Sequence, residues 1–323
     1  EDLTFEQATS LAVDLNGGNH TLERIRMGST VTSGIDTASG VSLTLRNSRF
    51  ESLTGTALRL GGASTVETVL VGGGAGDAAV VLSGASLSLR HVTVVGNGGK
   101  GVDNSAGGTA TIAHSILQDN AGGDMANVAC PSITWSNVKS QDCTVTGNDL
   151  HTSCALAADF RQLPSSSCLD YGPSPATYTG SPCLDLDSGA RLRDHDGNGI
   201  ATIDPGAFER ESTTLTPANV PNLRFTSKTT LQWDAEASGL ATEYHVYRDL
   251  KANLSYGNFG VCRDDLDPNR TDLVLTDAST PSPGQSFVYV ITAGRPAAGT
   301  QPDREGTMGL DRCMERSNFS PCP

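Results

Sequence analysis

Apolar residues recur at a nearly fixed interval through the first half of the chain. The anchor positions Leu22, Leu45, Val66, Leu89, Ile112 and Trp135 are separated by 23, 21, 23, 23 and 23 residues. Small or apolar residues recur in three further columns: Ile25, Ser48, Val69, Val92, Ser115 and Val138; Met27, Phe50, Val71, Val94, Leu117 and Ser140; Ile35, Leu58, Ala79, Val102 and Met125. A repeat of this length predicts one strand-and-turn rung per period, stacked on its neighbours.

Each rung must also turn corners, and the repeat supplies residues for that purpose. Gly96–Gly99 and Asp119–Gly123 contain the Gly and Asn residues that adopt left-handed backbone conformations readily. Stacked rungs lie about 4.8 Å apart, so each inward side chain packs on the corresponding one in the next rung. We therefore expect Val92, Val94, Val102, Ile112 and Leu117 to form buried columns.

Two segments carry a family resemblance. Residues 89–108, LRHVTVVGNGGKGVDNSAGG, and 112–125, IAHSILQDNAGGDM, resemble rungs of right-handed parallel β-helix proteins with pectate-lyase-like repeats. Residues 180–187 and 194–209, together with Ala158–Phe160, resemble the closing segment of many secreted bacterial β-helix proteins. The resemblance implies an architecture and not an activity, because this fold hosts lyases, hydrolases, adhesins and spacers.

The C-terminal third has a different pattern. A polar Thr/Pro linker, residues 211–220, precedes strand-like runs at 222–226, 229–234, 243–249, 271–276 and 286–293. This set resembles a fibronectin type III domain, with Trp233 and Tyr289 at its core positions. The sequence thus predicts an all-β chain: a right-handed parallel β-helix solenoid of about 23 residues per rung over 1–210, the linker, and a small fibronectin-III-like β-sandwich over 221–323.

The tail REGTMGLDRCMERSNFSPCP resembles the ending of a fibronectin-like variant common in secreted bacterial proteins. In that variant a cysteine follows a Tyr-Gly stretch, as Cys262 does here. The resemblance implies a disulfide between Cys262 and Cys322. Cys313 is an additional cysteine that leaves this pairing open.

All eight cysteines lie from Cys130 onward, and none forms a CxxC pair of the kind that holds zinc. We favour disulfides over free buried thiols, and hence an oxidising, extracytoplasmic compartment, periplasmic or at the cell surface. We expect Cys130–Cys143 and Cys154–Cys168 pairs. The pairing of Cys183 and Cys313 stays open.

Charge narrows the range of partners. The net charge is −14 and the chain contains four lysines, so its surface repels phosphate backbones and anionic lipid head groups. We therefore expect no nucleic-acid partner. No run approaches the roughly 20 apolar residues of a membrane-spanning helix. We take Glu1 as a processed or trimmed start.

One short motif resembles a metal-binding loop. Asp194, Asp196, Asn198 and Thr202 occupy the first, third, fifth and ninth positions of an EF-hand-type calcium loop. The twelfth position should carry an acidic residue, but Pro205 stands there. We favour a solvated turn and keep a structural calcium ion as the alternative; no other cofactor is expected.

Candidate catalytic groups are sparse. Asp103 and Asp124 fall on adjacent rungs, roughly 8 Å apart, and are the weak candidates for a glycosidase pair. His91 and His114 share one column, for which a polar turn ladder is favoured over a metal pair. Gly96, Gly98 and Gly101 match a dinucleotide fingerprint by letter alone, because no helix is expected to follow them.

These observations favour a non-enzymatic extracytoplasmic module. A rigid β-helix would serve as a scaffold for protein–protein or surface attachment, and an accessory subunit on the outer face of a membrane complex is one form that this role could take. Two alternatives remain: a carbohydrate-active β-helix enzyme, either a polysaccharide lyase or a glycoside hydrolase, and a calcium-dependent glycan-binding protein. A carboxylate cluster beside an arginine in a groove would favour the enzyme, whereas a flat outward face would favour the scaffold.

Overall fold

The computed structural model describes residues 3–5, 10–140, 149–173, 184–193, 202–210, 220–237, 239–254, 260–266, 269–295, 304–305, 310–311, 314–315 and 322. Within these residues the regular elements are strands and short 3-10 turns, the turns being η1 (Cys130–Ser132), η3 (Lys251–Asn253) and η4 (Asp264–Leu266). None of the described residues forms a helix of the length and hydropathy needed to cross a membrane. The chain is therefore all-β, as its turn-rich sequence predicts.

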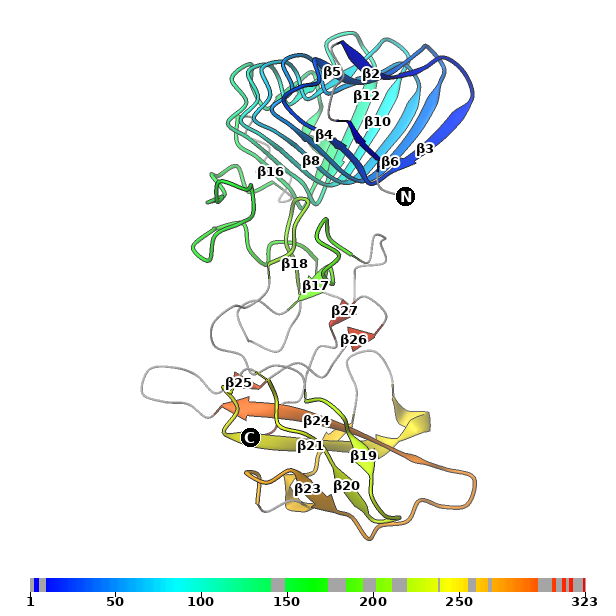
Figure 1. The fold of residues 1–323 in the computed structure, drawn as a ribbon, viewed down its shortest axis with the longest axis vertical. Coiled ribbons are helices and arrows are strands. Elements are labelled where there is room, and N and C mark those ends of the chain that lie inside the picture. The colour runs from blue at the N-terminus through cyan, green and yellow to red at the C-terminus, as the bar shows by residue number, and fades with distance from the viewer. Residues whose placement is uncertain are drawn as a thin grey trace. The chain divides into compact units, whose positions relative to one another are not determined.

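A parallel β-solenoid of about six rungs forms the first part of the molecule (Figure 1). Its first sheet has ten strands and pairs them in the order β1-β4-β6-β8-β10-β12-β15, with β3 beside β6 and β13 between β10 and β16. The strands are β1 (Leu3–Phe5), β3 (Asn19–Glu23), β4 (Ile25–Met27), β6 (Ser42–Glu51), β8 (Ala63–Gly72), β10 (Ser86–Val95), β12 (Thr109–Ala113), β13 (Ile116–Gln118), β15 (Ile133–Thr134) and β16 (Asn137–Val138).

A second parallel sheet of six strands completes the rungs, in the order β14-β11-β9-β7-β5-β2. Its strands are β2 (Leu11–Leu15), β5 (Ser33–Thr37), β7 (Leu58–Leu60), β9 (Ala79–Val81), β11 (Val102–Asp103) and β14 (Met125–Ala126). The column from Ile35 to Met125 is paired in the predicted register at every step. The same holds for the anchors from Leu22 to Ile112.

The last rung differs from the prediction. Ile112 pairs with Ile133 and not with Trp135, so this rung is two residues shorter than the 23-residue interval. Val138 consequently lies beside Leu117, two positions away from its expected column. The turn η1 directly precedes Ile133 and starts the strand early, and the apolar Trp135 imitates an anchor in the sequence.

The solenoid interior is the main hydrophobic core. Val94 and Val92 are 2% and 1% exposed, and Val102, Ile112 and Leu117 are completely buried. These columns pack on one another from rung to rung, as expected of like residues in register. Full burial of each such side chain contributes about 1.5–3 kcal/mol, so the stack stabilises every rung through its neighbours.

One side of the long strands is covered by a later part of the same chain. This part, residues 149–173, 184–191 and 203–210, is here named the closing segment. Leu70 and Val95 point outward from β8 and β10 and pack against Ala207 and Phe208. Ile116 of β13 packs against the disulfide between Cys154 and Cys168. The closing segment thus buries apolar side chains that an open sheet would expose to water.

The C-terminal part contains small antiparallel sheets (Figure 1). One sheet has the order β19-β20-β23, formed by β19 (Arg224–Phe225), β20 (Thr230–Gln232) and β23 (Val274–Thr276). Another has the order β22-β21-β24-β25, formed by β21 (Glu243–Leu250), β22 (Val261–Cys262), β24 (Phe287–Arg295) and β25 (Arg304–Glu305). Leu231, Trp233, Tyr244, Val246, Leu275, Ile291 and Ala293 form their shared core.

Contacts divide the chain into two compact units. The first comprises Glu1–Pro173, Gly180–Arg191 and Ile203–Arg210; the second comprises Ser174–Thr179, Leu192–Thr202 and Glu211–Pro323. A short sheet in the order β18-β17-β27-β26 explains part of this division, because β17 (Leu192–Arg193) pairs with β27 (Met314–Glu315) near the end of the chain. The remaining strands of that sheet are β18 (Thr202–Ile203) and β26 (Leu310–Asp311).

Two of the three expected disulfides join described residues, Cys154–Cys168 and Cys262–Cys322. Cys130 is also disulfide-bonded. Cys143, its expected partner, lies outside the described residues, as do Cys183 and Cys313.

Val94→Asp tests the stacking. This substitution places an unpaired carboxylate in the core and should lower the free energy of unfolding by several kcal/mol. Thr111→Asp is the matched control, because Thr111 is exposed on β12, and it should change stability by no more than about 0.5 kcal/mol. Urea unfolding followed by circular dichroism measures both. Equal midpoints for the two variants would contradict the register.

Candidate functional site

The outward column of the six-stranded sheet contains paired charges. Arg59 of β7 contacts both carboxylate oxygens of Asp36 on the preceding rung at 3.2 Å. Lys100 contacts Asp103 at 2.9 Å, and the backbone N–H of Ser105 donates to the same carboxylate. Partial burial would raise the pKa of Asp103, but the hydrogen bonds from Ser105 and Lys100 outweigh it and hold the pKa below its ordinary value. Asp103 is therefore ionised, and the positive charge of Lys100 balances its negative charge.

Asp124 belongs to an interior ladder of amides. Asn97 donates from Nδ2 to Oδ1 of Asn120 at 2.8 Å, and Asn120 donates from Nδ2 to Oδ1 of Asp124 at 2.9 Å. The other carboxylate oxygen of Asp124 accepts the backbone N–H of Ser140 at 2.8 Å. The side chain is 1% exposed. Asp124 therefore provides hydrogen-bond acceptors for donors in a buried turn, where unpaired polar groups would be costly.

The two weak catalytic candidates therefore occupy different environments. Asp103 points outward from β11 beside a lysine, whereas Asp124 is enclosed within a turn and accepts hydrogen bonds from Asn120 and Ser140. A glycosidase needs two carboxyl groups that face one sugar ring from opposite sides. The structure does not bring these two side chains to a common face.

The segment considered as either a solvated turn or a calcium loop lies largely outside the described residues. Asp194, Asp196 and Asn198 are not described, and Thr202 begins β18. The calcium hypothesis therefore stays a prediction.

His91 and His114 stack in the column where the sequence places them. Their ring centroids are 4.9 Å apart and their planes are inclined by 13°. Arg24, Asn47, Thr68, His91, His114 and Trp135 all have a positive φ, between 49° and 56°. The column is thus a ladder of left-handed residues at which each long strand bends. Trp135 occupies the corresponding place in the last rung, because that rung is two residues shorter than the 23-residue interval.

The stacked pair His91 and His114, here named the histidine ladder, lies where the closing segment meets the solenoid. Gly206 donates its backbone N–H to the carbonyl oxygen of His114 at 2.8 Å, and Ala207 donates to Oγ1 of Thr93 at 2.9 Å. A Cβ atom on Gly206 would lie 2.7 Å from Oγ1 of Thr93, so glycine is required at this contact. Arg191 is 1% exposed and donates to the carbonyl oxygens of Gly206 and Ala207.

Burial keeps both imidazoles neutral. Burial, followed by the nearby charge of Arg191, lowers the pKa of His91 well below its ordinary value. Burial, followed by Arg90 and Arg191, lowers the pKa of His114 to about 4. Neutral stacked rings can lie against a buried guanidinium, whereas protonated rings would repel it.

A buried pair of acids supports the same segment. Asp204 is completely buried and accepts the backbone N–H groups of Asp170 and Arg210. Glu209 accepts the backbone N–H of Asp204 with both carboxylate oxygens. Burial raises the pKa of Asp204 to about 7, and burial together with the charge of Asp204 raises that of Glu209. These carboxyl groups hold loop backbone, a role that the sequence analysis did not identify.

An exposed cluster fastens the closing segment to β6. Arg49 donates to Oδ1 of Asp187 at 2.7 Å, and Arg161 donates from Nε to Oδ2 of the same carboxylate at 2.9 Å. The two guanidinium groups lie 5.1 and 4.8 Å from the centroid of the Phe208 ring. Such cation–π contacts add about 0.5–1 kcal/mol each at exposed sites.

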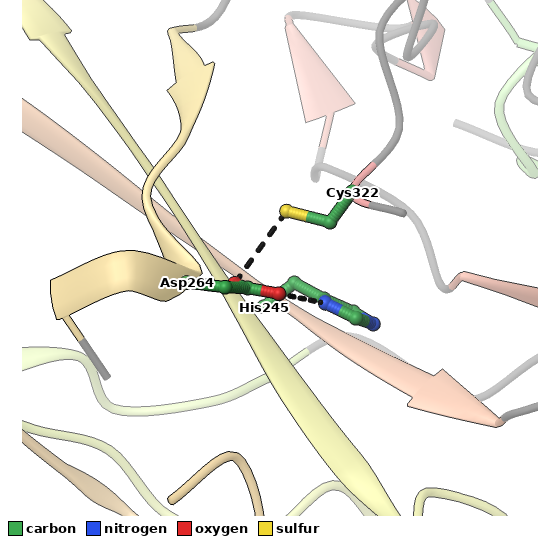
Figure 2. A group of neighbouring side chains, drawn as sticks. All are labelled: His245, Asp264 and Cys322. Carbon is green, nitrogen blue, oxygen red and sulfur yellow. Dashed lines mark hydrogen bonds and ion pairs between the residues drawn. The ribbon is translucent and has the colours of Figure 1, made fainter. Parts of the chain in front are cut away.

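The C-terminal unit has its own cluster of chemically reactive groups, which the sequence analysis also missed. Figure 2 shows His245 of β21, Asp264 at the start of η4, and Cys322 near the C-terminus. Nδ1 of His245 lies 2.9 Å from Oδ2 of Asp264, and Sγ of Cys322 lies 3.5 Å from Oδ1. Among the described residues this is the one group of three metal-ligating side chains. His245 and Cys322 lie 19 and 58 residues from Asp264 in the sequence, so no local motif indicates this cluster.

The histidine ladder makes stability depend on pH. A base whose folded pKa is lowered contributes stability that is present above about pH 6.5 and is lost as the pH falls toward 4. His91→Asn/His114→Asn should remove this loss, and Asn47 shows that asparagine fits the column. Asp204 and Glu209 act in the opposite direction, because their raised pKa values favour the folded state as the pH falls.

The informative quantity is therefore the stability of the parent minus that of the double variant, measured by urea unfolding at pH 7, 6 and 5. This difference should fall as the pH is lowered. A difference that stays constant with pH would contradict neutral buried imidazoles.

Comparison with known proteins adds no relative: no protein-family model, curated protein or solved structure matches this chain. The family resemblance therefore rests on the solenoid rungs, the closing segment and the tail of the sequence alone. The classification that stands on the structure is a parallel β-solenoid with stacked strands, followed by small antiparallel sheets.

Proposed function

We propose that the chain is a rigid extracytoplasmic scaffold whose solenoid presents one flat sheet to a protein partner. The observation that carries this proposal is the attachment of the closing segment across successive rungs. It contacts Arg49 of β6, Leu70 of β8, Thr93 of β10 and Ile116 of β13. A segment tied to four neighbouring strands resists bending and sliding of the rungs, which is the mechanical property that a scaffold requires.

The six-stranded sheet is the proposed binding face. Its outward column runs Asp14, Asp36, Arg59, Val80, Asp103 and Ala126, one residue per rung in continuous register. In this column Asp36 pairs with Arg59, and Asp103 pairs with Lys100, so the face combines short side chains with local ion pairs. The net charge of −14 favours a partner with a basic surface.

The finer classification belongs to the same proposal. A right-handed, pectate-lyase-like β-helix is supported by the parallel rungs and by the resemblance of 89–108 and 112–125. A fibronectin-III-like sandwich is supported by the three-stranded and four-stranded sheets around Trp233. A periplasmic or cell-surface location, where the chain would serve as an accessory subunit, is supported by the disulfides.

Site-specific photo-cross-linking in intact cell envelopes tests the proposed face. A photoreactive residue at Val80 lies in the middle of the outward column, and one at Ala121 lies in an exposed turn outside that sheet. We expect one defined protein adduct from Val80 that is competed away by excess purified parent protein, and none from Ala121. The same adducts from both positions, or none from either, would rule out this face as the attachment surface.

Asp103→Asn separates the scaffold from a carbohydrate-active enzyme. The parent should release no sugar from a panel of pectic, acidic and neutral polysaccharides, and the variant should behave identically. Its stability should fall by no more than about 1 kcal/mol, because an ion pair that stays partly exposed to solvent contributes little and an asparagine can still accept the N–H of Ser105. Sugar release by the parent that disappears in Asp103→Asn would establish the enzyme instead. Reducing-end assays at neutral pH provide the measurement.

A further inference from the structure

The Cys262–Cys322 disulfide lies within a set of side chains suited to a metal ion. It joins residues 60 positions apart and connects β22 to the end of the chain. Oδ1 of Asp264 lies 3.5 Å from the sulfur of Cys322, and Oδ2 of Asp264 lies 2.9 Å from Nδ1 of His245 (Figure 2). One sulfur, one imidazole nitrogen and one carboxylate oxygen thus form a single cluster, and the second sulfur is bonded directly to the first.

The spacing of these atoms fits a tetrahedral zinc site. Zinc binds sulfur at about 2.3 Å and nitrogen or oxygen at about 2.0–2.2 Å, so ligand atoms around it lie roughly 3.3–3.8 Å apart. In the structure the ligand atoms of His245, Asp264 and Cys322 all lie within 4.8 Å of one another. The sulfur of Cys262 is bonded directly to that of Cys322. Once the S–S bond is broken, the two sulfurs can move apart to the separation that a tetrahedral site requires.

We infer that reduction of this disulfide converts Cys262, Cys322, His245 and Asp264 into a binding site for a zinc-type divalent cation. A dithiol reductant supplies two electrons and two protons: its own thiols become a disulfide, the S–S bond breaks, and both cysteines become thiols. Cation binding then displaces the two thiol protons to solvent. In the oxidised protein the sulfurs are bonded to each other, and the site does not form.

Neighbouring charges support the reduced, metal-bound state. Two thiolates and Asp264 carry three negative charges against the two positive charges of the ion. Arg270 supplies a further positive charge, since Nη1 lies 3.3 Å from Oδ2 of Asp264, and the same guanidinium also pairs with Glu243 at 3.5 Å. Glu243 lies 3.7 Å from Nε2 of His245, the nitrogen that faces away from Asp264. A carboxylate in that position fixes the tautomer and orientation of a metal-bound imidazole.

The second disulfide provides an internal comparison. Cys154 and Cys168 are 2% and 0% exposed and pack with Ile116, Leu150 and Leu156. Among the described residues, Cys154 and Cys168 belong to no group of three metal-ligating side chains. Reduction of both disulfides should therefore create a mixed-ligand metal site at Cys262–Cys322 and none at Cys154–Cys168.

The consequence is an exchangeable cross-link. A disulfide and a metal ion would connect the same two segments, β22 and the chain end, in oxidising and reducing conditions respectively. The metal ion would then hold this connection whenever the two cysteines are reduced, and the disulfide would hold it whenever they are oxidised. This inference is independent of the proposed scaffold function.

Cobalt(II) is the probe, because thiolate coordination gives it a charge-transfer absorption and tetrahedral geometry gives it intense visible bands. The full chain is reduced with dithiothreitol, desalted under argon and titrated with cobalt(II). We expect one cobalt per chain with both absorptions, displaced by zinc, and no such spectrum for the oxidised protein. A featureless spectrum in the reduced protein would overturn the inference.

His245→Gln and Asp264→Asn keep all eight cysteines, so they separate this site from adventitious thiolate binding. Each should weaken cobalt binding by at least about tenfold, whereas Cys154→Ala/Cys168→Ala should leave it unchanged. Unchanged binding in the first two variants would overturn the inference, because the bound thiolates would then belong to other cysteines. The melting temperature of each oxidised variant checks that it is folded.

Alkylation mapping of the unmodified chain gives a readout that needs no variant. The reduced protein is treated with iodoacetamide with and without zinc, and the cysteines are assigned by peptide mass spectrometry. Zinc should protect Cys262 and Cys322 at least about tenfold relative to Cys154 and Cys168. Equal protection at all four, or none, would overturn the inference.

Discussion

The parallel hydrogen-bond register between successive rungs is the constraint on which the first unit depends. A shift of one residue would move every inward side chain to the outward face. The register therefore has to hold at Leu45 and Val66 as firmly as at Leu89 and Ile112, and the pairing is continuous through all of them. This constraint explains why corresponding side chains of successive rungs lie in contact. Amide lies on amide and imidazole on imidazole, and a carboxylate lies beside a guanidinium of opposite charge.

The same constraint creates a problem at the strand bends. Each long strand contains one residue of positive φ, and stacking places these residues directly beside one another. Seryl hydroxyls relieve the resulting backbone mismatch, because Oγ of Ser48 and of Ser115 accept the N–H groups of Ile25 and Val92 from the preceding rung. The bend thus recurs from rung to rung, and a seryl hydroxyl accepts a backbone N–H at some of these corners. Beyond it, the outward face becomes apolar and needs the closing segment as a cover.

The sequence predicted the columns well because they depend on local periodicity and on a repeat that copies itself. It misplaced Trp135, since an apolar residue at the expected interval cannot reveal that the preceding turn has become shorter. It could not place Arg191, Asp204 and Glu209, whose partners are backbone groups of irregular loops. It also missed the His245–Asp264 contact, because a contact between a strand and a short 3-10 turn leaves no periodic signal.

The two units solve the same problem of small irregular segments in different ways. The solenoid holds its closing segment by burying imidazoles and carboxyl groups near Arg191. Burial is the largest cause of the pKa shifts of His91 and Glu209, and it favours the uncharged form of each group. The C-terminal unit connects β22 to the chain end through Cys262 and Cys322 and surrounds that bond with polar groups. The Cys154–Cys168 disulfide, in contrast, packs among the apolar side chains of Ile116, Leu150 and Leu156. The response to the environment therefore differs between the units: protonation of buried imidazoles in the first, and the proposed exchange of a disulfide for a metal ion in the second.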